Sequence, residues 1–191
     1  MQQTGDLGQI IERGRIITVF GSSRAQPGDS EYLAAARLGR LLAERGWTLC
    51  NGGFTGTMTA ASQAAKEAGG TTIGVTVPTY FEGVANPWVD RNLAATSLFA
   101  RLEQLVSLGD AYVVLHGGIG TLLELAMVWN EVQSDQAGKP VVIVGEEWAE
   151  VIRLLLERFP MRPGEAASLT LVPTVEAAVG HLEQHFARQQ G

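Results

Sequence analysis

AYVVLHGGIGTLLE, residues 111–124, is the stretch that decides the fold of this chain. Its first five residues are apolar, which predicts a buried strand. Three glycines follow, at positions 117, 118 and 120, and an apolar helical pattern continues to Trp129. A strand that ends in glycines and then opens a helix favours anion binding. Backbone N–H groups can approach a phosphate there, and the helix N-terminus adds partial positive charge.

Two side chains extend this predicted anion site. Thr121 can cap the helix or donate its hydroxyl to a phosphate oxygen. Glu124 lies about one helical turn further on, so its carboxylate stays near the same opening. A lone acid at a helix N-terminus most often only favours the helix dipole. Beside a phosphate cradle the catalytic interpretation is the better one, and the pattern indicates chemistry on a phosphorylated small molecule.

The strand-then-helix order repeats on both sides of this stretch. Apolar runs predict further strands at residues 16–20, 47–50, 72–77, 141–144 and 169–172. Helical spacing predicts helices at residues 31–45, 58–68, 95–108, 122–132, 148–159 and 175–188. This alternation predicts an α/β fold, a Rossmann-like doubly wound parallel sheet in a single domain. We expect an N-terminal extension over residues 1–14, a domain over 15–191, and a surface loop at 79–92 that could cover the site.

Composition narrows the class of protein. The chain has 191 residues, 46% hydrophobic and 18% charged, which suits one globular domain. A net charge of −6 argues against a broad nucleic-acid surface. A single cysteine excludes an internal disulfide, and no apolar run approaches the ~20 residues of a membrane helix. With no signal-peptide pattern at the N-terminus, we expect a cytoplasmic protein with neither nucleic acid nor membrane as a partner.

Several other chemistries fit the residues poorly. The loop after the first strand, GSSR at residues 21–24, lacks the G-x-G-x-x-G spacing of dinucleotide-binding proteins, and no P-loop motif occurs. Neither of the two lysines, Lys66 and Lys139, lies in a glycine-rich loop, which disfavours a pyridoxal-phosphate enzyme. His181 and His185 have no third ligand at a recognisable spacing, so we expect no metal centre. Cys50 is better explained as a small core residue than as a nucleophile.

Two glycine motifs in the right order resemble those of a known family. GGFTGTM at residues 52–58 is similar to the GGxxGxM loop, and HGGIGTLLE at residues 116–124 to the PGGxGTxxE motif, of the LOG proteins. These are cytokinin-activating phosphoribohydrolases and their bacterial relatives. The resemblance runs from about residue 16 to the C-terminal helix. It implies a Rossmann-like homodimer that hydrolyses the N-glycosidic bond of a nucleoside 5′-monophosphate, to free base and ribose 5-phosphate, with no cofactor.

The resemblance also implies site residues. The catalytic pair falls on Arg101 and Glu124, although from the residues alone Arg101 could equally be a solvated residue of a helix face. The implied phosphate- and nucleotide-binding positions are Gly21, Ser22, Gly52, Gly53, Gly56, Met58, Gly117, Gly118, Gly120 and Thr121. A carboxylate near the ribose can stabilise an oxocarbenium-like transition state or activate water. Phe54, Met58, Tyr80 and Trp88 could stack on a base, although such residues more often pack the interior.

Departures from the family pattern predict a divergent branch. His116 stands where the motif has proline, and we favour a neutral replacement over a ligand contact. Ala100 and Leu102 flank Arg101 where the family usually has glutamate and lysine, and Leu123 replaces a second glutamate of many members. Asn51 replaces the first glycine of the second loop. The loss of charge around Arg101 changes the expected substrate preference.

Three functions remain open from the sequence. The first is a nucleoside-monophosphate N-glycosidase that acts on a cytokinin riboside monophosphate or AMP. The second is a non-catalytic carrier of a phosphorylated ligand, such as a nucleotide or the molybdenum cofactor, as in the related carrier proteins of that cofactor. The third is a nucleotide-sensing subunit, which a Glu124 salt bridge away from the cleft would favour.

Overall fold

The computed structural model describes residues 14–78, 83–134, 138–160 and 164–189. They form a seven-stranded sheet with the strand order β4-β3-β2-β1-β5-β6-β7, in which every neighbouring pair is parallel. The strands are β1 (Ile16–Phe20), β2 (Thr48–Asn51), β3 (Thr72–Thr76), β4 (Arg91–Ala94), β5 (Ala111–Val114), β6 (Val141–Val144) and β7 (Leu169–Val172). The predicted single-domain, doubly wound parallel sheet is confirmed.

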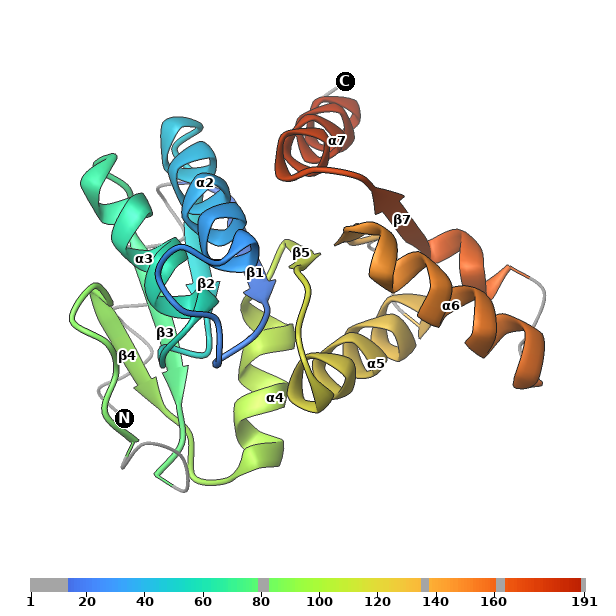
Figure 1. The fold of residues 1–191 in the computed structure, drawn as a ribbon, viewed down its shortest axis with the longest axis horizontal. Helices are drawn as coiled ribbons and strands as arrows, with labels where there is room; N and C mark the ends of the chain where they lie inside the picture. The colour runs from blue at the N-terminus through green and yellow to red at the C-terminus, as the bar shows by residue number, and fades with distance from the viewer. Residues whose placement is uncertain (1–13, 79–82, 135–137, 161–163, 190–191) are drawn as a thin grey trace.

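Helices cover both faces of this sheet (Figure 1). Their bounds are α2 (Ser30–Glu44), α3 (Thr57–Glu67), α4 (Leu98–Leu108), α5 (Ile119–Ser134), α6 (Glu146–Arg158) and α7 (Val175–Arg188), with a 3₁₀ turn η2 at Glu165–Ser168. Helices α2, α3 and α7 pack on one face, and α4, α5 and α6 on the other. Within the described ranges, no helix is both long enough and apolar enough to cross a membrane.

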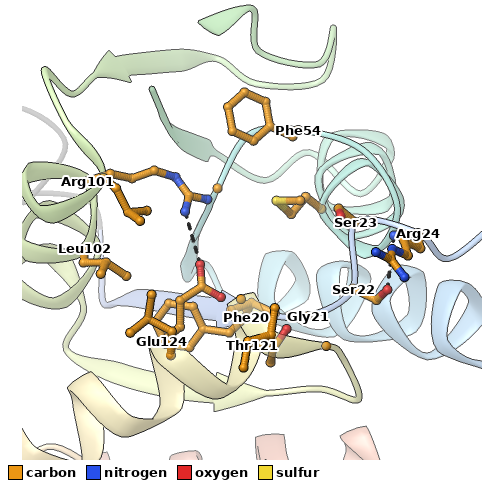
Figure 2. A pocket seen from close by; sticks show the side chains of 18 residues that line it. Phe20, Gly21, Ser22, Ser23, Arg24, Phe54, Arg101, Leu102, Thr121 and Glu124 are labelled. Atoms are coloured by element: carbon orange, nitrogen blue, oxygen red, sulfur yellow. Dashed lines mark hydrogen bonds and ion pairs between the residues drawn. The ribbon is translucent and has the colours of Figure 1, made fainter. Parts of the chain in front are cut away.

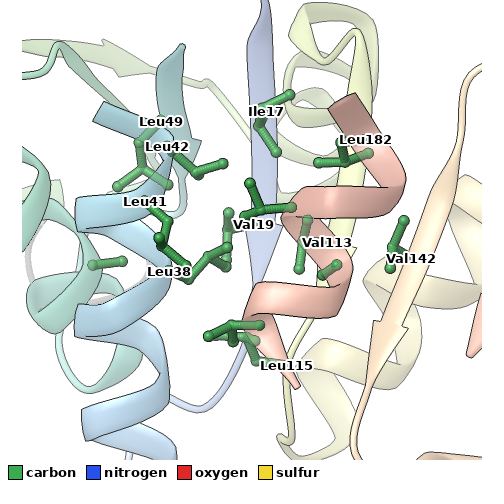
Figure 3. Close-up of a cluster of buried hydrophobic side chains, with 14 of the residues drawn as sticks. Ile17, Val19, Leu38, Leu41, Leu42, Leu49, Val113, Leu115, Val142 and Leu182 are labelled. Carbon is green, nitrogen blue, oxygen red and sulfur yellow. The ribbon is translucent and has the colours of Figure 1, made fainter. Parts of the chain in front are cut away.

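Alternation along β1 explains how one strand serves two cores. Ile17 and Val19 point into the cluster under α2 and α7, where they meet Leu38 and Leu182 (Figure 3). Ile16 and Phe20 point to the opposite face and join the cluster under α4 and α5. Successive side chains of a strand face opposite sides of the sheet, so a run that is apolar at every position fits a strand buried on both faces.

Two predictions of local structure were wrong. The expected loop at residues 79–92 ends in part of strand β4, which pairs in parallel with β3 at the edge of the sheet. Residues 79–82 lie outside the described part of the chain. The helix expected from residue 95 begins at Leu98, because the Ser97 hydroxyl caps it by accepting a hydrogen bond of 3.1 Å from the Ala100 N–H.

Candidate functional site

A cavity of about 530 Å³ opens at the carboxyl ends of β1 and β2, beside the N-terminus of α5. The strand order reverses between β1 and β5, and the crevice at such a switch point is where open α/β sheets bind ligands. Two arginines and one glutamate are the charged residues of its lining, a balance that suits an anion. The lining residues are Val19 to Arg24, Gly52, Phe54, Met58, Leu98, Arg101, Leu102, Gly118 to Thr121, Leu123 and Glu124.

Arg101 is fixed in the wall of this cavity from several sides (Figure 2). Its Nε donates a hydrogen bond of 2.8 Å to the carbonyl oxygen of Val75, near the end of β3. Its Nη1 lies 3.4 Å from Oε1 of Glu124, and its guanidinium carbon lies 5.6 Å from the centre of the Phe54 ring. The residue is only 7% exposed. Arg101 is therefore a buried, oriented cation rather than a solvated residue of the helix face.

Glu124 faces Arg101 from α5, and its side chain is 12% exposed. Burial raises the pKa of the Glu124 carboxyl to about 7, because water is largely removed from the charged form, while Arg101 acts in the opposite direction. The carboxyl therefore changes its charge near neutral pH, as a general acid or base requires. The ion pair belongs to the cavity lining and does not lie away from the cleft.

The second glycine loop forms the support for Arg101. A Cβ at Gly52 would overlap Nη2 of Arg101 and lie 2.8 Å from the Met58 sulfur, so only glycine leaves Arg101 in place. The buried Asn51 side chain accepts a hydrogen bond of 2.8 Å from the Gly53 N–H and donates to Met58 and Ser62. It ties the loop to the start of α3. From the sequence Asn51 is only a departure from the glycine motif, and nothing in the motif indicates this function.

The first and second loops are joined to each other. Thr57 donates its backbone N–H to the Ser22 carbonyl at 2.9 Å, and Thr55 donates its hydroxyl to the Ser23 carbonyl at 2.9 Å. Gly56 has a φ of +67°, and a Cβ there would overlap the Ser22 carbonyl oxygen. This close approach places the first loop, with Ser22, Ser23 and Arg24, along one side of the cavity.

The glycines of the third loop, residues 117–120, differ in whether packing requires them. A Cβ at Gly117 would overlap the Thr121 hydroxyl, so this glycine is required by packing. Gly118 and Gly120 have no left-handed φ, and a Cβ on either would meet no atom within 4 Å. Neither backbone conformation nor packing within the described residues accounts for these two glycines. Because both line the cavity, the open space above them is available to a ligand.

The structure brings most of the predicted site residues together. Lining the cavity are Gly21, Ser22, Gly52, Met58, Arg101, Gly118, Gly120, Thr121 and Glu124. Gly53, Gly56 and Gly117 lie behind these residues in the loops and do not belong to the lining. No motif indicates Leu98, and from the sequence Leu102 is only a lost charge beside Arg101, yet both make part of the wall apolar. Sequence reasoning also missed the Val75 carbonyl, because a backbone oxygen leaves no signal in the sequence.

The remaining candidates lie elsewhere. His116 Nδ1 lies 3.2 Å from Glu31 Oε1, outside the lining of the main cavity. Cys50 is fully buried, which raises the pKa of its thiol to about 12, and it is a core residue as expected. Trp88 does not line the cavity, and Tyr80 lies outside the described residues. In the described ranges, no group of three or more His, Cys, Asp and Glu side chains could hold a metal ion.

Comparison with known proteins adds to this geometry. Residues 14–162 match the model of the SLOG cluster4 family. The chain is 32% identical over 172 residues to the cytokinin riboside 5′-monophosphate phosphoribohydrolase of Mycobacterium tuberculosis, an alignment that covers 85% of this chain and 91% of the relative.

Solved structures with a similar fold include two proteins of the molybdenum cofactor. The molybdenum cofactor binding protein of Rippkaea orientalis superposes with a TM-score of 0.75 at 26% identity, covering 91% of this chain and 98% of that one. The molybdenum cofactor carrier protein of Chlamydomonas reinhardtii gives 0.72 at 29% identity, covering 92% and 99%. The family match spans most of the described fold and both glycine motifs. The chain therefore belongs to the SLOG cluster4 family, among the LOG proteins whose motifs its glycine-rich loops resemble.

Proposed function

We propose that this protein hydrolyses the N-glycosidic bond of a nucleoside 5′-monophosphate, releasing a free base and ribose 5-phosphate. The observation that carries this proposal is the buried Arg101–Glu124 pair in the cavity wall, one helical turn from the N-terminus of α5. The first N–H groups of a helix have no partner within the helix, and those at residues 119–121 are free to bind the phosphate. That position brings the ribose toward Glu124.

Each member of the pair has a distinct role in this mechanism. Cleavage of a glycosidic bond develops positive charge on the sugar. The ionised Glu124 carboxylate stabilises that charge or accepts a proton from the attacking water. Arg101 orients the carboxylate through the 3.4 Å contact, while the Val75 carbonyl orients Arg101 in turn. The phosphate, held away from the bond that breaks, supplies binding and orientation.

The apolar part of the wall bears on the substrate. Leu98 and Leu102 of α4, with Phe54 and Met58, surround the part of the cavity near Arg101. A purine ring, with or without an apolar N6 substituent, suits such walls. AMP or a cytokinin riboside monophosphate is therefore our proposed substrate, in agreement with the name of the Mycobacterium tuberculosis relative. We place this reaction in the cytoplasm, without a cofactor.

We also propose that the protein is a homodimer. Ile119 and Leu123, which line the cavity, are 82% and 44% exposed, and Phe99, next to the lining residue Leu98, is 82% exposed. Exposed apolar surface of this kind commonly marks a contact with another protein. Light scattering after gel filtration would give twice the chain mass, and Leu123→Glu would shift the protein toward the monomer. A monomeric wild-type protein at micromolar concentration would contradict the dimer.

A second candidate function is carriage of a phosphorylated ligand without hydrolysis. The similarity to the two molybdenum cofactor proteins over nearly their whole length favours it. So does Leu102, which adds an apolar side chain where the LOG motif usually has a lysine. The two functions differ in a simple respect, because a carrier retains its ligand through purification and returns it unchanged.

The test is base release from a panel of nucleotides. Wild-type protein is incubated with AMP, GMP, CMP, UMP and an N6-prenylated AMP, and free base is measured by chromatography. Glu124→Gln serves as the matched control, because glutamine keeps the size of the side chain but cannot ionise. We expect release from at least one purine nucleotide, and loss of that release in the variant. No release by a well-folded wild-type protein would overturn the proposal and favour carriage.

A further inference from the structure

A second cavity of about 250 Å³ lies directly beside the main one. It is bounded by the third glycine loop and by the first turns of α6. Its lining residues are His116, Gly117, Gly118, Ile119, Leu122, Glu147, Trp148 and Val151. Nothing in the proposed hydrolysis uses this space, because the ribose and the base occupy the main cavity on the side of Arg101.

The two cavities meet at the third loop. Gly118 and Ile119 line both of them. A Cβ on Gly118 would meet no atom within 4 Å, and the residue has no left-handed φ, so the protein alone does not require glycine there. Gly118 therefore leaves open space where the two cavities share their lining, directly beside the proposed phosphate position at the start of α5.

The walls of the second cavity indicate what could enter it. Trp148, Val151 and Leu122 make it mainly apolar, and the Trp148 indole is fixed by donating its N–H to the Leu115 carbonyl at 3.0 Å. Glu147 adds an exposed carboxylate. A flat ring that carries N–H donors, or a positive charge, suits this combination.

The charges disfavour a second phosphate. None of the described residues that line the second cavity is an arginine or a lysine. His116, the one basic side chain there, is paired with Glu31 at 3.2 Å. A diphosphate would place a further negative charge near Glu147 and the His116–Glu31 pair, and no lysine or arginine among the described lining residues would balance it. A single phosphate esterified on both sides avoids that repulsion.

We propose that the second cavity is a binding subsite for a group esterified to the far side of the ligand's phosphate. The protein then accepts nucleoside 5′-phosphodiesters, with the first nucleoside in the main cavity and a second arm, a flat ring that carries N–H donors, between α5 and α6. This inference rests on the proposed function for the position of the phosphate and the first nucleoside. It adds a ligand class that a monophosphate hydrolase does not need.

Binding by calorimetry tests the proposal with four probes, on wild-type protein and on Glu124→Gln protein. The probes are adenylyl-(3′→5′)-adenosine, the 5′-methyl phosphate ester of adenosine, AMP and ADP. The methyl ester is the matched control because it has the same charge at phosphorus but no second arm. We expect the dinucleotide to bind about tenfold more tightly than the methyl ester. ADP should bind no more tightly than AMP.

Two variants test whether the tighter binding of the dinucleotide arises in the second cavity. Val151→Trp fills the second cavity from a residue that is 38% exposed, so it should remove the advantage of the dinucleotide and leave the affinity of the methyl ester unchanged. Gly118→Ala has room for its methyl group in the free protein, yet it should weaken the dinucleotide about fivefold more than the methyl ester, without changing the midpoint of unfolding.

Failure of this inference and failure of the proposed function give different results. One contrary result is that AMP and the methyl ester bind while the dinucleotide binds no more tightly than the methyl ester, and another is that the tighter binding of the dinucleotide persists in Val151→Trp. Either result shows that the second subsite is wrong and leaves the proposed function unaffected. If none of the adenosine probes binds to the wild-type protein, the proposed position of the nucleotide is wrong, and the subsite fails with it.

Discussion

The glycines of the loop at residues 52–56 are held against protein atoms, whereas two of the three glycines at residues 117–120 face open space. A Cβ at Gly52 or Gly56 would overlap a neighbouring atom, and Gly53 is confined by β3. At Gly118 and Gly120 a Cβ would meet nothing. The loop at residues 52–56 needs glycine for the fold and for the placement of Arg101. We propose that the loop at residues 117–120 needs Gly118 and Gly120 for what binds there, so that similar sequences serve a structural function in one loop and a ligand-binding function in the other.

The largest expected effect is on stability, when a glycine that is packed against protein atoms is replaced by alanine. Gly56→Ala places a methyl group against the Ser22 carbonyl and forces alanine to a φ of +67°. We expect the free energy of unfolding to fall by about 3 kcal/mol or more, measured by urea denaturation. The matched control is Gly120→Ala, in the first turn of α5, which should be neutral or stabilising by about 0.5–1 kcal/mol. Equal losses in the two variants would contradict the contrast.

The next largest effect is on catalysis, through the support of Arg101. Gly52→Ala moves the guanidinium away from the Val75 carbonyl and from Glu124, because its methyl group needs the space that Nη2 occupies. We expect base release to fall about 100-fold in a folded protein. Arg101→Ala and the double variant Gly52→Ala/Arg101→Ala should be equally inactive, because both changes act through one side chain. A double variant much weaker than Arg101→Ala would show that Gly52 acts by another route.

The pH dependence of stability and of base release tests the role of Glu124, the partner of Arg101. Its carboxyl pKa is raised from 4.5 to about 7 by burial. Between these two values the folded protein binds more protons than the unfolded chain, so the free energy of unfolding falls as pH rises from about 4.5 to about 7 and then levels off. We expect this decrease to be about 3 kcal/mol, and Glu124→Gln to flatten it. Base release should rise over the upper part of that range as the carboxylate forms, and a rate independent of pH between 5 and 8 would argue against an ionised Glu124 as the active form.

The smallest expected effect is on the affinity for AMP, when a glycine of the loop at residues 117–120 is replaced. Gly120→Ala adds a methyl group above the N-terminus of α5, where the proposed phosphate lies. The affinity for AMP should fall about tenfold, although the variant is at least as stable as the wild type. Calorimetry on the same samples used for denaturation would measure this. An unchanged affinity would mean that the phosphate binds elsewhere.

Sequence patterns were sufficient for most of the sheet, for clear physical reasons. The strands of the interior are buried on both faces, so their apolar runs are continuous and easily read. Strand β4 was missed because it lies at the edge of the sheet and begins with Arg91 and Asn92, which interrupt the apolar pattern. The cap at Ser97, by contrast, was a signal in the sequence that could have placed the start of α4.

The site was less accessible to sequence reasoning than the fold. The motifs indicated which loops would meet at one edge of the sheet, but not which of their glycines would face the cavity. The burial of Arg101 depends on a carbonyl oxygen of β3 and on a ring from the second loop, 26 and 47 positions away. Such contacts follow from the packing of α4 on the sheet. No local pattern around Arg101 reveals them.

The most direct test of the central claim follows the fate of bound AMP. Wild-type protein in slight excess is mixed with AMP, and adenine, ribose 5-phosphate and remaining AMP are counted together over time. We predict conversion to one adenine and one ribose 5-phosphate for each AMP, and AMP that stays intact in Glu124→Gln protein. AMP that binds to the wild type and is recovered unchanged would contradict hydrolysis and identify the cavity as a carrier site.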